Sequence, residues 1–350
     1  MRVTLGAVIF ETLQSGGCLS YLVGCEATSQ AIAIDPQQPQ QGRLLGLVAA
    51  RGLRLHYALD THTHADHFSA TRALAERLGI PSVMHRLSPA PFVDLRVDDG
   101  ETLIVGELRL RVLHTPGHTA DSICLVMPDR VFTADTLLLG SCGRTDLPTG
   151  DPEQLHDSLF GKLLQLDGAL TVYPGHNYKG TPSSTLAEQI ASNPRLARRE
   201  RAAFVEMMRS LSIEMPQHLT EALRTNSTGG KTVAQIIAEA AEQVAFVSME
   251  ELRRRVDAGR RDMAILDVRE ADAFAAGHVP GALHLPRGQL ELRVDAVFPD
   301  PSVRIAVYCE FGKISTIAAA TLRSMGFSHA VALDGGFRAW CEGGHPIEKA

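Results

Sequence analysis

The sequence has no long apolar run, no basic cluster and no closely paired cysteines. No apolar run approaches the roughly 20 residues that cross a bilayer, so we expect no membrane span. The net charge is -6 without a concentration of Lys and Arg, which argues against nucleic acid as the main partner. Residues 1–10 lack the layout of a signal peptide, and the six cysteines show no Cys-x-x-Cys spacing. We therefore expect a cytoplasmic protein without a disulfide framework or a zinc ribbon.

The 350 residues are 45% hydrophobic and 21% charged, which suffices for two domains with their own cores. In residues 1–180, short strand patterns alternate with helical patterns at 68–78 and 152–167, which predicts a layered α/β domain. Residues 181–247 are patterned as helices, and we interpret them as a helical annex and linker. Residues 248–350 alternate strands and helices again, which predicts a second α/β domain with a mostly parallel sheet.

Three histidines and a carboxylate occupy six consecutive residues in Thr61-His62-Thr63-His64-Ala65-Asp66-His67. The preceding run, 55–60, has the pattern of a buried strand. Alternate residues of an extended chain point the same way, so His62 and His64 can face one point in space. Neutral imidazoles that converge with a carboxylate suit zinc or iron. The alternative is a polar loop whose histidines are merely solvated.

Three further candidate ligands each follow a later strand pattern. His118 lies in Thr115-Pro-Gly-His-Thr119, Asp135 in Phe132-Thr-Ala-Asp-Thr136, and His176 in Tyr173-Pro-Gly-His-Asn-Tyr178. Loops at strand ends are where a rigid scaffold usually presents ligands. Each residue alone could merely cap a chain end, but together with residues 62–67 they predict a metal site.

These motifs together resemble the metallo-β-lactamase superfamily over residues 1–180. The resemblance implies an αβ/βα sandwich with a metal site along one edge. All seven ligand positions of that superfamily are present: His62, His64, Asp66, His67, His118, Asp135 and His176. The full set allows a two-metal hydrolase resembling glyoxalase II, in which a bridging hydroxide is the nucleophile.

A further segment, Gly143-Arg-Thr-Asp146, resembles the corresponding segment of persulfide dioxygenases. This resemblance implies one Fe(II) per chain, held by His64, His118 and Asp135, with open positions for O2 and a sulfur substrate. The groups that would orient these ligands and hold water are His62, Asp66, His67 and His176.

The same resemblance implies that Arg144 and Tyr178 hold glutathione. A guanidinium can pair with a carboxylate through two parallel hydrogen bonds, so Arg144 suits this role. The alternative for Arg144 is a structural salt bridge with Asp146. Of the cysteines in this half, we expect Cys142 to line the metal pocket and Cys18, Cys25 and Cys124 to be core residues.

A second chemical centre is Cys309 in Val307-Tyr-Cys-Glu-Phe-Gly-Lys-Ile-Ser315. A strand pattern ends at Cys309, and a helix is predicted to start near Ser315. The loop amides and the helix N-terminus would favour a thiolate and a bound anion. The alternative is an inert buried cysteine at the end of a strand. Cys341 has no assigned role.

The surroundings of Cys309 resemble a rhodanese domain over residues 248–350. The matching segments are Leu266-Asp-Val-Arg-Glu270, Gly277-His-Val-Pro-Gly-Ala282 and Asp334-Gly-Gly-Phe-Arg-Ala-Trp340. The resemblance implies that Cys309 is the nucleophile that carries a sulfane sulfur as a persulfide. Its loop would comprise Glu310, Phe311, Gly312, Lys313, Ile314 and Ser315.

One position departs from the rhodanese pattern. Many active rhodaneses have Arg where this chain has Ile314. The absence of that cation weakens the case for small anionic donors such as thiosulfate, and it leaves open a sensing or docking role for this domain.

Taken together, the resemblances imply a persulfide dioxygenase fused to a rhodanese. Glutathione persulfide and O2 would give sulfite and glutathione, while Cys309 would exchange sulfur between thiosulfate or sulfite and glutathione. Glutathione persulfide and sulfite can serve both reactions, which gives the fusion a chemical logic. The sequence fixes neither the direction of the rhodanese reaction nor whether the chain forms a homodimer.

Overall fold

The computed structural model describes residues 7–349 except 179, 181, 182, 217 and 261. The chain divides into two compact units, Met1–Gly230 and Lys231–Ala350, and each has its own sheets and core. This division falls inside the segment 181–247 that the sequence predicts as an annex and linker. The predicted domain limits at 180 and 247 stay predictions.

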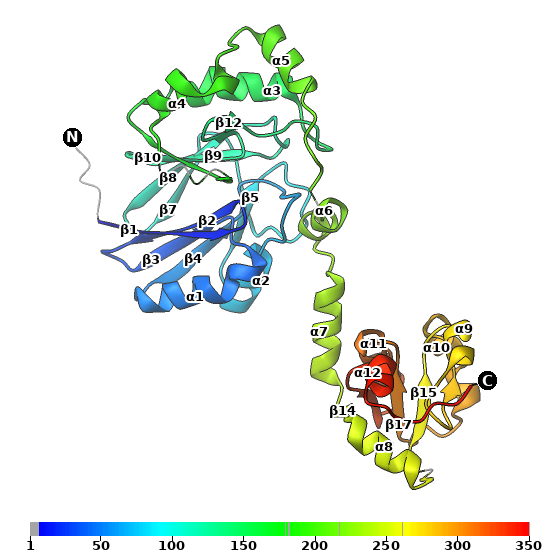
Figure 1. The fold of residues 1–350 in the computed structure, drawn as a ribbon. Helices are drawn as coiled ribbons and strands as arrows, with labels where there is room; N and C mark the ends of the chain where they lie inside the picture. Colours follow the sequence, from blue (N-terminus) through cyan, green and yellow to red (C-terminus); the bar gives the residue numbers. More distant parts are fainter. Residues whose placement is uncertain (1–6, 179, 181–182, 217, 261, 350) are drawn as a thin grey trace. The chain divides into compact units, whose positions relative to one another are not determined.

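Two main sheets form the centre of the first unit in the part of the chain that the structure describes (Figure 1). The first sheet contains, in spatial order, β1 (Val8–Ser15), β2 (Cys18–Cys25), β3 (Gln30–Ile34), β4 (Arg54–Leu59), β5 (Ser82–His85) and β6 (Leu95–Val97). The second contains β13 (Thr171–Pro174), β10 (Arg130–Ala134), β9 (Ile123–Val126), β8 (Leu108–His114) and β7 (Thr102–Val105). A small hairpin is formed by β11 (Leu137–Leu138) and β12 (Ser141–Cys142).

Apolar residues alternate along these strands and build three core layers. Residues such as Val23 and Leu125 fill the space between the two sheets. The outer face of the first sheet packs against Leu44 of α1 (Gln41–Ala50) and Leu74 of α2 (Thr71–Leu78). The outer face of the second sheet is covered by α3 (Pro152–His156), α4 (Leu186–Ser192) and α5 (Arg201–Arg209). The predicted αβ/βα sandwich is confirmed.

Helix boundaries in the first unit differ from the sequence prediction in two places. The helix predicted from residue 68 begins at Thr71, because the Ser69 hydroxyl donates to Asp60 and the Ser69 amide is held by Asn226. The helix predicted over 152–167 is α-helical only to His156. It continues as a π-helical turn, Asp157–Lys162, and a 3-10 turn, Leu163–Gln165.

The annex within the first unit consists of short helices. Thr185 and Glu188 form a capping box at the start of α4. Asn193 caps a 3-10 turn at Pro194–Leu196, and Glu200 caps the start of α5. The last annex helix that belongs to the first unit is α6 (Leu219–Thr228).

The second unit has the predicted parallel sheet, in the order β14-β18-β17-β15-β16. Ser248 caps α8 by accepting the amide of Glu251. The strands are β14 (Phe246–Val247), β15 (Ala264–Asp267), β16 (Leu283–His284), β17 (Ile305–Tyr308) and β18 (Ala330–Leu333). The helices are α7 (Val233–Gln243), α8 (Met249–Asp257), α9 (Ala271–Ala276), α10 (Leu290–Val297), α11 (Lys313–Ser324) and α12 (Gly336–Glu342). Among the described residues, no helix of either unit is long and apolar enough to cross a bilayer.

Candidate functional site

Four loops meet at one edge of the sandwich and bring the candidate ligands together. Residues 60–70 connect β4 to α2, and His118 lies between β8 and β9. Asp135 directly follows β10, and His176 follows its parallel neighbour β13. The ends of neighbouring parallel strands lie side by side, so the fold itself places these two residues together.

The ligand atoms of His62, His118 and Asp135 all lie within 4.8 Å of one another, and the three side chains are buried. His118 Nε2 is 3.5 Å from Asp135 Oδ2. Two imidazoles and a carboxylate in this arrangement form a candidate metal centre.

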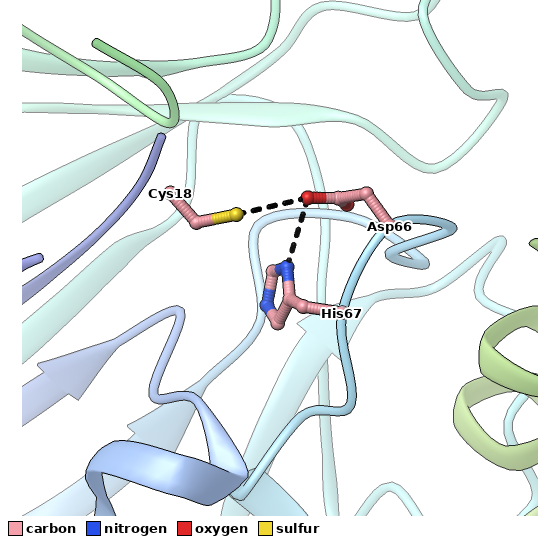
Figure 2. A group of neighbouring side chains, drawn as sticks. All are labelled: Cys18, Asp66 and His67. Atoms are coloured by element: carbon pink, nitrogen blue, oxygen red, sulfur yellow. Dashed lines mark hydrogen bonds and ion pairs between the residues drawn. The ribbon is translucent and has the colours of Figure 1, made fainter. Parts of the chain in front are cut away.

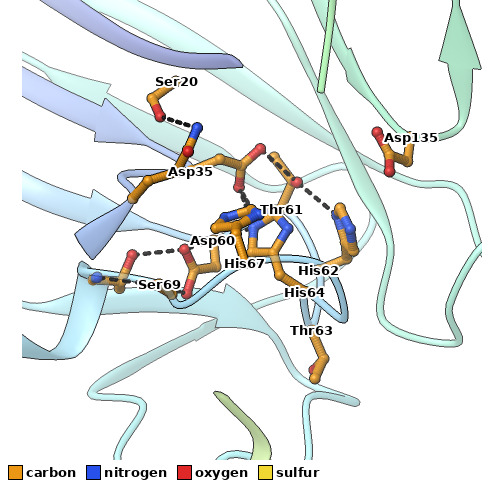
Figure 3. A network of polar contacts seen from close by, with 12 residues as sticks. Ser20, Asp35, Asp60, Thr61, His62, Thr63, His64, His67, Ser69 and Asp135 are labelled. Atoms are coloured by element: carbon orange, nitrogen blue, oxygen red, sulfur yellow. Dashed lines mark hydrogen bonds and ion pairs between the residues drawn. The ribbon is translucent and has the colours of Figure 1, made fainter. Parts of the chain in front are cut away.

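Hydrogen bonds leave the inward nitrogens of both histidines available to a cation. The Thr61 hydroxyl donates to Asp35 at 2.8 Å, so its oxygen accepts the proton of His62 Nδ1 at 2.9 Å (Figure 3). His62 Nε2 is then unprotonated, and it is buried without a partner among the described residues. His118 Nδ1 donates to the carbonyl oxygen of Arg144 at 2.8 Å, which frees its Nε2 in the same way. Metal-bound imidazoles show this pattern, so the donor set fits a metal.

His64 is not in this trio, which differs from the predicted set of His64, His118 and Asp135. Its Nε2 is held at 3.0 Å by Asp35 Oδ1, in a separate group with Asp60. The rings of His62 and His64 lie 4.1 Å apart, but their ligand atoms belong to different groups and do not face one point as the alternation argument predicts. Because the buried Asp35 and Asp60 bind the Nε2 side of His64, this nitrogen does not face His118 and Asp135 (Figure 3). His62 lies there instead. His64 Nδ1 is buried without a partner among the described residues.

Asp66, His67 and His176 form a second polar cluster, together with Cys18. Asp66 Oδ2 lies 3.2 Å from His67 Nδ1, and the Cys18 thiol donates to it at 3.1 Å (Figure 2). The same oxygen lies 2.9 Å from His176 Nε2. His176 Nδ1 bonds Asp135 at 2.7 Å, which connects this cluster to the candidate metal centre. Cys18 was predicted to be a core residue. That prediction is wrong, because the Gly16–Gly17 turn starts β2 at the cavity wall.

Charges in this cluster offset the effect of burial. Burial raises the pKa of Asp135, but the neighbouring charge of His176 brings it far below its usual range. Burial lowers the pKa of His67, but hydrogen bonds to Asp66 and Cys18 raise it to about 10. Burial raises the pKa of the Cys18 thiol, and hydrogen bonds with His176 and His67 bring it below its ordinary value. The cluster therefore stabilises anionic acids beside cationic imidazoles.

Two glycines let the backbone pack directly against Asp135. A Cβ at Gly143 would lie 1.9 Å from the Asp135 carbonyl oxygen, and a Cβ at Gly175 would lie 2.5 Å from Asp135 Oδ1. A side chain at Gly143 would displace the Asp135 backbone, and a side chain at Gly175 would displace its carboxylate.

A cavity of about 890 Å³ opens beside the metal centre and is lined by His118, Asp135 and His176. Cys142 lines it as predicted. Tyr178 also lines it, with 74% of its side chain exposed and its ring stacked on His176 at 5.2 Å.

Two arginines line the cavity in different ways. Arg144 forms a two-pronged salt bridge with Asp146, at 2.6 and 2.7 Å, and donates to the carbonyl oxygens of Ile213 and Glu214. The salt bridge with Asp146 that the sequence analysis gave as the alternative for Arg144 is therefore present, and the glutathione role of Arg144 stays a prediction. Arg195 is half-buried in the cavity wall, and its guanidinium has no ion pair or hydrogen bond to any described residue. The sequence analysis missed Arg195, whose only sequence signal is its place in an Asn-Pro-Arg turn.

The annex also reaches the metal loop through Asn226, another residue that the sequence analysis missed. This buried side chain in α6 bonds the backbone of residues 64, 67 and 69. The annex therefore belongs to the site and is more than a linker.

In the second unit, Cys309 directly follows β17 and is only 4% exposed. Its Sγ accepts a hydrogen bond from the Ser315 amide at 3.2 Å, in the first turn of α11. The Gly312 and Gly336 backbones have φ of +81° and +69°, and Gly336 packs against the loop so closely that no Cβ would fit. The loop thus cradles the sulfur as the sequence predicts.

The remaining loop residues place charge and apolar surface around Cys309. Phe311 and Ile314 are 58% and 52% exposed, and Lys313 is exposed as well. Glu310 pairs with Arg269, whose guanidinium is also bound by Asp267. These ion pairs give Arg269 a structural role in which it supports the loop.

An αβ/βα sandwich with a His- and Asp-lined centre at its edge defines a metallo-β-lactamase domain. The Metallo-beta-lactamase superfamily model matches residues 15–176, and the Rhodanese-like domain model matches residues 248–343. The human protein named Persulfide dioxygenase ETHE1, mitochondrial, is 37% identical over 214 residues, which cover 60% of this chain and 84% of that protein. The chain belongs to the ETHE1 persulfide dioxygenase family of the metallo-β-lactamase superfamily, and it carries a rhodanese-like domain after that region.

Two further relatives frame this assignment. The crystal structure of ETHE1 from Myxococcus xanthus superposes on this chain with a TM-score of 0.62 and is 41% identical in sequence. The match covers 64% of this chain and 100% of the Myxococcus chain. A hydroxyacylglutathione hydrolase of Anaeromyxobacter dehalogenans is 37% identical over 190 residues, which cover 54% of this chain and 72% of that protein.

Proposed function

We propose that the first unit is an iron-dependent dioxygenase that converts glutathione persulfide and O2 to sulfite and glutathione. The convergence of His62, His118 and Asp135 carries this proposal, because two His and one carboxylate are the donor set of non-haem ferrous oxygenases. One Fe(II) per chain would be held by these three residues. Bound there, it supplies the O2 chemistry that side chains cannot perform. His64, Asp66, His67 and His176 would orient the ligands and hold water.

The cavity provides a place for glutathione. Its volume of about 890 Å³ lies within the range of small-molecule sites, roughly 300–1,000 Å³. Arg195 offers an uncommitted guanidinium for a glutathione carboxylate. Tyr178 offers an exposed aromatic face and a hydroxyl at the rim. Arg144, already paired with Asp146, shapes the wall and holds His118 through its carbonyl oxygen.

The reaction balances with one water. Glutathione persulfide, O2 and water give glutathione, sulfite and two protons, and the outer sulfur loses the four electrons that O2 gains. Asp66 and His176 line the cavity beside the candidate metal centre, where they form a hydrogen-bonded carboxylate–imidazole pair. Burial of the centre keeps bulk water from the reacting sulfur.

We also propose that Cys309 transfers sulfur between thiosulfate or sulfite and glutathione. The Ser315 amide already donates to Sγ, and the N-terminus of α11 favours negative charge on that sulfur. Sulfur transfer that is lost in the Cys309→Ser variant would support this role. Absence of transfer in the wild-type chain would favour the sensing or docking role that the exposed Ile314 suggests.

Oxygen uptake by the iron-loaded chain on adding glutathione persulfide, with sulfite assayed in parallel, tests the dioxygenase. We expect uptake that matches sulfite and that is abolished by His62→Ala or His118→Ala. The Cys309→Ser variant should keep uptake, which separates the two reactions. No uptake from a fully iron-loaded chain would overturn the proposal.

The second candidate is a glyoxalase II-like thioester hydrolase with two metal ions. The cluster of Asp66, His67 and His176 beside Asp135 favours it, since these residues complete a second ligand set. Two metal ions per chain and hydrolysis of a glutathione thioester without oxygen uptake would establish this function instead.

A further inference from the structure

The loop around Cys309 leaves its sulfur almost completely buried. Cys309 is only 4% exposed, and its Sγ accepts the Ser315 amide at 3.2 Å. The Phe337 amide donates to the Cys309 carbonyl oxygen at 2.8 Å, which fixes this end of the loop to α12. The side chains of residues 310–314 therefore border the path of a sulfur donor to Sγ.

Two of these side chains are large, apolar and exposed. Phe311 is 58% exposed and Ile314 is 52% exposed. The guanidinium of Arg338 lies 5.6 Å from the centre of the Phe311 ring, so a cation–π contact holds this ring in place. Ile314 directly precedes Ser315, whose amide holds the sulfur. Phe311 and Ile314 therefore form an apolar entrance to Cys309.

The charged groups around the apolar entrance offer little to an anion. Arg269 pairs with Glu310 at 3.1 Å, and Arg338 pairs with Glu342 at 3.0 Å, so each guanidinium already has a carboxylate partner. Lys313 is a further cation of the loop, but it is exposed, where water and salt screen its charge. An oxyanion at the apolar entrance would therefore meet two apolar side chains and one screened ammonium.

The chemistry of sulfur transfer places the rest of the donor at this entrance. Sγ attacks the outer sulfur in line with the S–S bond, so the inner sulfur lies about 4–5 Å from Sγ, roughly the length of two S–S bonds. The group on the inner sulfur then faces the apolar entrance. The three oxygens of thiosulfate would lose water there without gaining a charged partner, whereas the carbon chain of an organic persulfide would bury apolar surface.

We propose that Phe311 and Ile314 make Cys309 selective for organic persulfides over thiosulfate. The proposal rests on the proposed sulfur transfer by Cys309 and fixes the class of its donor. The Cys309 thiolate attacks the outer sulfur, a new Sγ–S bond forms and the S–S bond of the donor breaks. The outer sulfur keeps its hydrogen, and the electron pair of the broken bond leaves with the inner sulfur as an organic thiolate. Atoms and charge balance without an oxidant or a reductant.

The test compares glutathione persulfide with thiosulfate as donors to Cys309 in the full chain, kept free of oxygen so that the persulfide is not oxidised. Mass spectrometry of the Cys309 peptide follows the added sulfur in a single turnover. Each rate is divided by the rate of the same donor with N-acetylcysteine, which removes the intrinsic reactivity of the donor. We expect this relative rate to be roughly 10-fold higher for glutathione persulfide, the effect of burying about 60 Å² of apolar surface.

Matched variants test the two side chains of the apolar entrance. Ile314→Arg should raise the relative rate for thiosulfate by roughly 10- to 100-fold, the effect of a charge-assisted hydrogen bond. Leu292→Arg is the control, because it adds the same charge at an exposed leucine of α10, outside the loop, and it should leave both relative rates unchanged. Phe311→Ala should lower the relative rate for glutathione persulfide and leave that for thiosulfate unchanged.

The outcomes separate this inference from the function on which it rests. A relative rate for thiosulfate that equals or exceeds that for glutathione persulfide would overturn the inference and leave sulfur transfer standing. The same relative rates in Ile314→Arg and Leu292→Arg would overturn it as well. No added sulfur on Cys309 from either donor would overturn the proposed sulfur transfer itself, and the inference with it.

Discussion

The side-chain amide of Asn226 donates to the carbonyl oxygen of His64 at 2.9 Å, although the two residues are 162 positions apart in the chain. The same amide donates to the His67 carbonyl oxygen at 2.8 Å, and its Oδ1 accepts from the Ser69 amide at 3.1 Å. One side chain of α6 thereby satisfies three backbone groups of the loop that carries the candidate metal ligand His62.

Asn226→Ala should weaken iron binding by roughly 10- to 100-fold, because residues that orient metal ligands have effects of this size. The loop would lose three hydrogen bonds that fix its backbone. The measurement is a competition titration for Fe(II) against a chelator, made alongside thermal unfolding.

Asn193→Ala is the matched control for this prediction. Asn193 is also a buried annex residue that clamps two carbonyl oxygens, those of Leu138 and Ser141, but it holds the cavity wall. We expect a comparable loss of thermal stability with iron affinity unchanged. Equal iron affinity in the two variants would contradict a specific role for Asn226.

Arg195→Gln should raise KM for glutathione persulfide and leave kcat largely unchanged. A charge-assisted hydrogen bond contributes about 1.5–3 kcal/mol, which corresponds to roughly 10- to 100-fold in KM. Steady-state oxygen uptake measures both constants. Arg201→Gln is the control, since Arg201 pairs with Glu153 and Asp157 and does not line the cavity. A lower kcat with unchanged KM would show that Arg195 does not anchor the substrate.

Gly336→Ala should abolish sulfur transfer by Cys309 while oxygen uptake continues. Its φ is +69°, and a Cβ would lie 2.5 Å from the Gly312 amide nitrogen and 2.6 Å from the Cys309 carbonyl oxygen. The loop must move to admit it. Gly344→Ala is the control, because Gly344 also has a positive φ, +67°, but a Cβ there would meet open space. This change should lower the free energy of unfolding by only about 1–2 kcal/mol and keep sulfur transfer. Transfer at the wild-type rate in Gly336→Ala would contradict the role of this close packing.

Acid should destabilise the first unit through His85. This residue is buried against the ring of His114, and burial lowers its pKa to about 4 despite the nearby Asp98 and Asp121. Below about pH 6.5 the unfolded chain binds a proton that the folded chain does not, so stability falls as pH drops from 6.5 towards 4. The full loss is on the order of 3 kcal/mol.

Urea unfolding of the first unit at pH 7 and pH 5 measures the effect of His85. The difference between the two stabilities should shrink in His85→Gln and persist in His56→Gln, a change of a half-buried histidine in β4. An unchanged difference in His85→Gln would assign the acid sensitivity to other groups.

The sequence analysis placed the candidate ligand loop at a strand end, where the structure also has it, because the relevant information is local. A strand pattern that ends in residues 62–67 places its histidines at a strand end, and the later motifs repeat that arrangement. The choice between His62 and His64 is not local. It depends on Asp35, whose carboxylate bonds both Thr61 and His64 from a backbone position with φ of +49°. No pattern within residues 60–70 contains that contact.

Residues that act from distant segments escaped the sequence analysis for the same reason. Asn226 and Arg195 lie in the annex, where helical spacing indicates structure but not which polar residue points at the site. Cys18 has the pattern of a core strand, and only the packing of β2 beside residue 176 brings its sulfur to the cavity.

Arg144 connects the candidate ligand His118 to the annex segment at residues 213 and 214. Its carbonyl oxygen holds His118, while its guanidinium holds the backbone of residues 213 and 214. A chain shortened to the end of the superfamily match at residue 176 would keep the candidate ligands His62, His118 and Asp135 and lose the annex that Arg144 and the metal loop rest on. A truncated protein that contains only the first unit should therefore end at residue 230, because the candidate metal centre needs the annex residues that support it.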